Sequence, residues 1–247
     1  MRTLLPTLLL GSSLLLAQEK PKPSPAKDVP KVLYSIPLLV EPGKKTRVML
    51  RGAKLESVTE VRHGDAKLKI TAAAKKSAPP NNYPATKFGD SECEIELDLP
   101  KDFKEGIIEL VAIAPGGASK YKLNVAQGST REKEPNDSFT QAQDVKFPTI
   151  VDAVIGKERD VDMFQFAGQA GQKITAEILA ARLGSPADLN LTLYDSAKNV
   201  LAQCDDTPES ADPIIEFTLP RNGIYYLGVQ ESSDLGGAQY GYRLLVK

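Results

Sequence analysis

The sequence predicts an all-β protein with two β-sandwich domains, the first Ig-like and the second jelly-roll-like, after a cleaved signal peptide. Short apolar runs recur along the chain, and turn residues such as Pro42-Gly43 and Pro115-Gly116-Gly117 separate them. Several runs alternate apolar and polar residues, which is the period of a half-buried strand. A polar stretch at residues 127–131 divides the pattern, so we expect domains at 31–126 and 132–247.

The first 17 residues have the pattern of a secretory signal. Arg2 supplies the positive charge, residues 4–16 form a leucine-rich run, and Ala17 precedes the expected cleavage point. The run is too short for a comfortable transmembrane helix, so we expect no membrane span in the mature chain. Residues 18–30 are rich in Pro and Lys and are expected to form an extended linker.

Six strands are expected in the first domain, with an exposed loop at residues 72–84. The strands are Val32–Ile36, Thr46–Leu50, Leu68–Thr71, Cys93–Leu99, Ile107–Ile113 and Tyr121–Val125.

Alternation is clearest in the second domain. The alternating stretches are 174–178, 189–194, 215–219 and 240–246. Asn222-Gly223 predicts a hairpin between two strands. Many short strands in a stretch of this length suit a jelly-roll-like sandwich.

Composition excludes several function classes. The chain has 31 basic and 32 acidic residues, a balance that argues against a nucleic-acid partner. Cys93 and Cys204 fall in different predicted domains, so we expect two free thiols, and a zinc site of four Cys or Cys₂His₂ type is excluded by count.

Two short acidic runs are the main candidates for chemistry. Glu132-Lys133-Glu134-Pro135-Asn136-Asp137 carries three carboxylates and an amide, and Asp160-Val161-Asp162 adds two carboxylates. If the fold joins the two runs, they form an all-oxygen cage of the kind Ca²⁺ requires. The alternative is a solvated acidic linker in which Asn136-Asp137 caps a turn. A second group, Asp205, Asp206 and Asp212, is a weaker candidate for another cation.

Residues 31–125 resemble an IPT/TIG immunoglobulin-like domain. The resemblance is carried by Gly52 and Leu55, by the Gly116-Gly117 turn, and by the Pro-Gly opening at Pro42-Gly43.

The second half resembles the bacterial pre-peptidase C-terminal domain. Its landmarks occur in order as EKEPNDS (132–138), ERDVDMFQFAGQAGQKI (158–174), ADLNLTLYDSAKNVLAQCDD (187–206), FTLPRNGIYYLGV (217–229) and YGYRLLV (240–246). The resemblance implies a non-catalytic appendage of exported bacterial proteins. It also implies structural Ca²⁺ held by Glu132, Glu134, Asn136, Asp137, Asp160 and Asp162.

Enzyme activity is not expected. A Ser-His-Asp or Cys-His device needs a histidine base, and the only histidine is His63 in an expected turn. For a binding role, Tyr194 and Tyr225 are candidate ligand contacts. Tyr225 and Tyr226 must point to opposite faces of a strand, so only one of them can be core.

We therefore expect a bacterial protein that is secreted, periplasmic or at the cell surface, and that acts as a non-catalytic adhesion or substrate-targeting module. Its expected partners are extracellular matrix, polysaccharide or a cell-surface protein. The alternatives are a structural spacer of an envelope assembly and an accessory subunit of a secreted peptidase.

Overall fold

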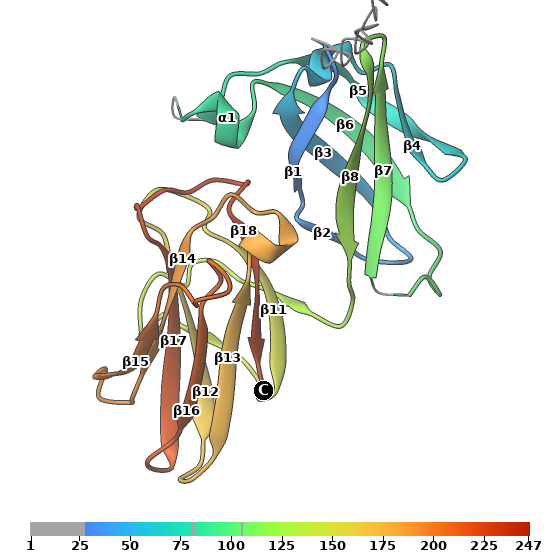
Figure 1. The fold of residues 1–247 in the computed structure, drawn as a ribbon. Coiled ribbons are helices and arrows are strands. Elements are labelled where there is room, and N and C mark those ends of the chain that lie inside the picture. The colour runs from blue at the N-terminus through green and yellow to red at the C-terminus, as the bar shows by residue number, and fades with distance from the viewer. Residues whose placement is uncertain (1–27, 81–82, 105) are drawn as a thin grey trace, which may run out of the picture.

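The computed structural model describes residues 28–80, 83–104 and 106–247. The predicted signal peptide and residues 18–27 of the predicted linker lie outside this part of the chain. Strands dominate it, which confirms the all-β class. Figure 1 shows two β bodies, one from the N-terminal half (blue to green) and one from the C-terminal half (yellow to red). No helix of the described residues is long and apolar enough to cross a bilayer.

The N-terminal half forms one eight-stranded sheet in the order β1-β3-β6-β5-β4-β7-β8-β2. Its elements are β1 (Lys31–Ile36), β2 (Leu39–Val40), β3 (Lys45–Ala53), η1 (Leu55–Ser57), β4 (Glu60–His63), β5 (Ala66–Lys76), α1 (Ala85–Phe88), β6 (Ser91–Asp98), β7 (Gly106–Ala114) and β8 (Gly117–Val125). The sheet is folded over into two layers. β5 belongs to both layers, because it pairs with β4 at its start and with β6 further along. β1 pairs with β3 whereas β2 pairs with β8, so the chain also passes between the layers at Pro37. The two layers enclose one buried cluster that includes Val48, Ile95 and Leu123.

The C-terminal half is a sandwich of two five-stranded sheets, in the orders β10-β12-β17-β14-β15 and β16-β13-β18-β11-β9. Its strands are β9 (Thr130–Arg131), β10 (Gln143–Asp144), β11 (Thr149–Val154), β12 (Val161–Gly168), β13 (Lys173–Leu179), β14 (Leu189–Tyr194), β15 (Val200–Cys204), β16 (Ile214–Thr218), β17 (Gly223–Glu231) and β18 (Gly241–Val246), with the 3₁₀ helix η3 at Ala181–Leu183. Alternate residues of each strand face inward, as the sequence pattern predicted, and Phe164, Leu191 and Leu244 are fully buried.

Two aromatic side chains of the N-terminal half belong to the core of the C-terminal half. Tyr34 of β1 and Phe88 of α1 are buried in the same cluster as Tyr240, and the rings of Phe88 and Tyr240 have centroids 6.0 Å apart. Asn124 of β8 also donates a hydrogen bond of 3.0 Å to the carbonyl oxygen of Leu183 in η3. The two halves therefore share a hydrophobic cluster.

Two local predictions were wrong. The expected loop at 72–84 begins later, because β5 continues to Lys76 opposite β6. Register irregularities between Ile70 and Ala72 and between Ala72 and Lys75 break the alternation, so the alanine run gave no strand signal.

The predicted hairpin at Asn222-Gly223 is the second error. β16 and β17 lie in different sheets, so this turn connects the two layers of the sandwich. Asn222 has a defined role there, since its side-chain oxygen accepts a hydrogen bond of 2.8 Å from the backbone N–H of Ala170.

We predict that Phe88→Ala lowers the free energy of unfolding by about 3 kcal/mol, because it leaves a cavity in the shared cluster. Chemical denaturation of the full chain would measure this change. Ile107→Ala is the control, since its side chain is 59% exposed and its loss should cost less than about 0.5 kcal/mol. Equal stabilities of the two variants would contradict the packing role of Phe88.

Candidate metal centre

The two acidic runs meet where the connection between β9 and β10 crosses from one sheet to the other. This crossing loop, residues 132–142, brings in four of the predicted ligands, and the start of β12 brings in Asp160 and Asp162. The loop is tied to β12 because the backbone N–H of Met163 donates a hydrogen bond of 3.0 Å to the carbonyl oxygen of Asn136. All six predicted residues therefore lie along one seam.

An inner triad of carboxylates is formed by Glu132, Glu134 and Asp162, whose nearest oxygens lie within 4.8 Å of one another. The Tyr242 hydroxyl donates to Asp162 Oδ2 at 2.6 Å, and the backbone N–H of Val154 donates to Glu132 Oε1 at 2.7 Å. The other oxygens, Asp162 Oδ1 and Glu132 Oε2, are buried and accept no hydrogen bond from the described residues.

An outer triad consists of Glu134, Asp137 and Asp160, again within 4.8 Å. Glu134 belongs to both triads, so the two are adjacent. Asp160 is buried, and its Oδ2 accepts a hydrogen bond of 2.6 Å from the backbone N–H of Gly156. Lys157 approaches this triad, with its Nζ 3.0 Å from Asp137 Oδ2 and 3.4 Å from Asp160 Oδ1.

Asn136 is the least expected member of the seam. It is completely buried, yet neither its side-chain oxygen nor its nitrogen has a hydrogen-bond partner among the described residues. A buried polar group without a partner costs about 1–3 kcal/mol. Such a group next to buried carboxylates has the features of a ligand for a cation.

Burial also perturbs the acids of the inner triad. Desolvation, together with repulsion from neighbouring carboxylates, raises the pKa of Glu132 to about 7 and the pKa of Asp162 to about 9. At the outer triad, hydrogen bonding from Lys157 lowers the pKa of Asp137. Asp162, and in part Glu132, therefore retain their protons at neutral pH unless a cation replaces them.

The donor set fits a hard cation. It contains only carboxylate and amide oxygens, and Ca²⁺ takes six to eight oxygen ligands at about 2.3–2.6 Å in flexible geometry. Zinc prefers nitrogen and sulfur donors, which the seam lacks.

The second acidic group is assembled differently from the prediction. Asp205 and Asp206 lie with Asp188, and all three are exposed. Ser232 donates a hydrogen bond of 3.0 Å to Asp205 Oδ1. The three acids are thus a solvated cluster at the surface.

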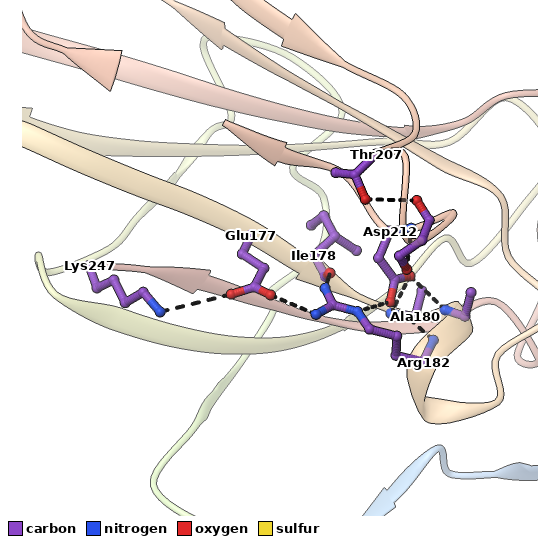
Figure 2. A network of polar contacts seen from close by, with 9 residues as sticks. Glu177, Ile178, Ala180, Arg182, Thr207, Asp212 and Lys247 are labelled. Atoms are coloured by element: carbon purple, nitrogen blue, oxygen red, sulfur yellow. Dashed lines mark hydrogen bonds and ion pairs between the residues drawn. The ribbon is translucent and has the colours of Figure 1, made fainter. Parts of the chain in front are cut away.

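Asp212 lies apart from this cluster, and both oxygens of its carboxylate already accept hydrogen bonds. Its carboxylate accepts hydrogen bonds of 2.7–3.0 Å from the backbone N–H groups of Ala180, Ala181 and Arg182, and one of 2.8 Å from Arg182 Nε. Figure 2 shows the network continuing from Arg182 through Glu177 to Lys247. Asp212 holds the start of η3 and is not available as the predicted ligand.

The tyrosine prediction was wrong for Tyr225. This side chain is 1% exposed in the core, where its hydroxyl donates to the carbonyl oxygen of Arg221 at 2.7 Å. Its neighbour Tyr226 faces outward with Tyr194, and both rings pack edge-on against Phe139 of the crossing loop, with centroids 5.1 Å apart. Alternation indicated that one tyrosine is core, but not which one.

Residues that the sequence did not single out complete the site. Tyr242 and Lys157 both contact the acids. Tyr242 is far from the acids in the sequence, and Lys157 is close to Asp160 but belongs to no recognisable motif. His63 lies half-buried at the end of β4, with its Nδ1 3.2 Å from the carbonyl oxygen of Glu109. Its ring forms no hydrogen bond with a Ser or Cys of the described residues.

Comparison with known proteins gives a family for the second half. Residues 160–231 match the model of the bacterial pre-peptidase C-terminal domain. A relative described as a probable subtilase-type serine protease of Deinococcus radiodurans is 36% identical over 129 residues, which are 51% of this chain and 18% of the relative. The chain thus spans about a fifth of that relative's length.

Solved structures with some likeness include the pre-peptidase C-terminal domain of a collagenase from Bacillus anthracis. It is 18% identical and fully covered, and it covers 47% of this chain with a TM-score of 0.37. A periplasmic inhibitor of g-type lysozyme from Aeromonas hydrophila is 14% identical, with 96% of its chain and 43% of this one covered, and a TM-score of 0.32.

The residues that match the family model lie in the C-terminal sandwich, and the match begins at Asp160 of the outer triad. Part of this sandwich, residues 160–231, is a bacterial pre-peptidase C-terminal domain.

Proposed function

We propose that the C-terminal sandwich binds Ca²⁺ in the seam, and that the chain serves as an exported, non-catalytic module for binding or targeting. One observation carries the metal proposal: Glu132 Oε2, Asp162 Oδ1 and the side-chain oxygen of Asn136 are buried without hydrogen-bond partners among the described residues, and the two acids belong to the inner triad. A cation would satisfy these oxygens together and would neutralise acids that otherwise repel one another.

The residues divide the work of holding the ion. Asp162 is anchored by Tyr242, and Glu132 by the N–H of Val154, so each presents one fixed oxygen. Glu134 and Asn136 come from the crossing loop, so a bound ion would fasten this loop to β12. Binding to the folded state alone would add about 2.7 kcal/mol of stability at a hundredfold excess of Ca²⁺ over its Kd.

The binding role rests on the family. A pre-peptidase C-terminal domain is non-catalytic, and the chain's single histidine contacts a backbone carbonyl oxygen, that of Glu109, and no Ser or Cys of the described residues. The partner would be extracellular matrix, polysaccharide or a cell-surface protein outside the cytoplasm. An accessory subunit of a secreted peptidase belongs to the same proposal, since a relative carries this region within a protein described as a protease.

A structural spacer is the second candidate. The hydrophobic cluster that joins the two halves through Phe88 and Tyr240 supports it, because such packing resists bending between the halves. A stiff two-part body suits the spacing of other components in an envelope assembly.

Our first test of this proposal is thermal unfolding of the full chain in millimolar Ca²⁺ and in EDTA, with Mg²⁺ as a second cation. We expect Ca²⁺ to raise the Tm by roughly 5–10 °C. Asp162→Asn and Glu134→Ala should lose the shift because each removes an inner ligand.

The matched control is Asp188→Asn in the exposed acidic cluster, which should keep the full shift. An identical Tm of the wild-type chain in Ca²⁺ and EDTA would overturn the proposed site.

The raised pKa values of Glu132 and Asp162 predict a pH dependence in EDTA. The folded chain keeps protons that the unfolded chain has already lost above about pH 4, so this stability is present at low pH and is lost as pH rises through about 7 and about 9. We expect the unfolding free energy to fall by about 1 kcal/mol per pH unit while one group titrates. Denaturation at pH 6 and pH 8.5 measures this fall.

Two comparisons make that result specific. The double variant Glu132→Gln/Asp162→Asn should show a flatter profile in EDTA. Saturating Ca²⁺ should also flatten the profile, because the ion-bound folded chain and the unfolded chain then both lack these protons. A wild-type chain that becomes more stable with rising pH in EDTA would contradict the assignment.

A pull-down against collagen, cellulose, chitin and cell-wall material separates the two functional candidates. We expect retention on at least one matrix, reduced by EDTA and by Asp162→Asn. Retention on none of them would favour the spacer.

A further inference from the structure

The metal seam contains more carboxylates than one ion needs. The inner and outer triads share Glu134 and together comprise five acids: Glu132, Glu134, Asp137, Asp160 and Asp162. Opposite oxygens around a Ca²⁺ ion are about 4.6–5.2 Å apart, twice the metal–oxygen distance. Each triad, with its oxygens within 4.8 Å, is therefore compact enough to surround its own ion.

A cation of the protein already contacts the outer triad. Lys157 Nζ lies 3.1 Å and 3.0 Å from the two oxygens of Asp137 and 3.4 Å from Asp160 Oδ1. Its contacts with two acids of one triad distinguish it from an ordinary surface pair. No lysine or arginine of the described residues forms an ion pair with Glu132, Glu134 or Asp162 of the inner triad.

The backbone of Lys157 is held in place. Its carbonyl oxygen accepts a hydrogen bond of 3.3 Å from the N–H of Asp160, and the N–H of the preceding residue, Gly156, donates to the Asp160 carboxylate. The same carbonyl lies so close to Gly236 that a Cβ there would collide with it. The ammonium is thus aimed at the outer triad by a turn that also presents Asp160.

We propose that the Lys157 ammonium occupies the second cation position of the seam, so that the chain binds one divalent ion, in the inner triad, instead of two. This inference rests on the proposed Ca²⁺ site. The ammonium offsets part of the charge of the outer triad: five carboxylates carry −5, and one Ca²⁺ with one ammonium supplies +3, whereas one Ca²⁺ alone would supply +2. Three donor hydrogens of an ammonium also suit the oxygens of Asp137 and Asp160.

The test is to remove the ammonium and count ions. Isothermal titration with CaCl₂ and native mass spectrometry of the full chain should give one Ca²⁺ for wild type and two for Lys157→Met, which keeps much of the aliphatic stem. Lys157→Gln is a second variant for the same purpose. Lys157→Arg keeps the charge and should return the count to one.

Two further variants locate the new ion. Lys133→Met removes a lysine of the crossing loop that forms no ion pair with the described residues, and it should leave the count at one. Adding Asp137→Asn to Lys157→Met should abolish the second ion, because it removes a ligand of the outer triad.

The outcomes separate this inference from the proposed function. A wild-type chain that binds no Ca²⁺ overturns both. One ion in wild type and one in both Lys157→Met and Lys157→Gln overturns the role of Lys157 alone, and so does a wild-type chain that binds two.

Discussion

The burial of carboxylate oxygens without hydrogen-bond partners is the constraint on which the C-terminal sandwich depends. Removing an ionised carboxylate from water costs several kcal/mol unless a partner compensates. Asp160 and Asp162 are both buried at the start of β12, and the amide of Asn136 is buried beside them. The crossing loop joins the two sheets at this point, so the closure of the sandwich at that end and the neutralisation of its acids are a single problem.

The seam solves this problem with different partners at its two ends. Tyr242 and the backbone of Val154 support the inner acids but bring no positive charge. Lys157 supports the outer acids with a full positive charge. Its side chain stays largely exposed to solvent, as is usual for an ion pair at the surface. Each triad keeps one buried acid, Asp162 in the inner triad and Asp160 in the outer one. Asp212 shows the contrasting case, in which backbone N–H groups and Arg182 satisfy a buried carboxylate completely.

Alternation along the chain predicted the strands well because inward-facing residues in a sandwich must be apolar. It failed where the strand pairing is irregular, as in the alanine run of β5. The hairpin prediction failed at Asn222-Gly223, where the turn connects strands of two different sheets instead of two paired strands of one sheet. The acids of the seam could be named from two short runs because the resemblance to the pre-peptidase C-terminal domain singled them out, whereas spacing alone left open whether the fold joins the two runs. Tyr242 and Lys157 could not, because their contacts are made by tertiary packing. For Tyr225 the pattern allowed either face of the strand. In the structure its side chain takes the buried face, where its hydroxyl donates to the carbonyl oxygen of Arg221.

The shared aromatic cluster has a consequence for how such a protein can change in evolution. Tyr34 and Phe88 fill space in the core of the neighbouring sandwich, so each half has become part of the other's packing. A gene rearrangement that moved the C-terminal half to a new context would leave Tyr240 without the ring that covers it. The two halves would therefore be inherited as a pair, and a substitution at Phe88 or Tyr240 would be tolerated only with a matching change in the other half.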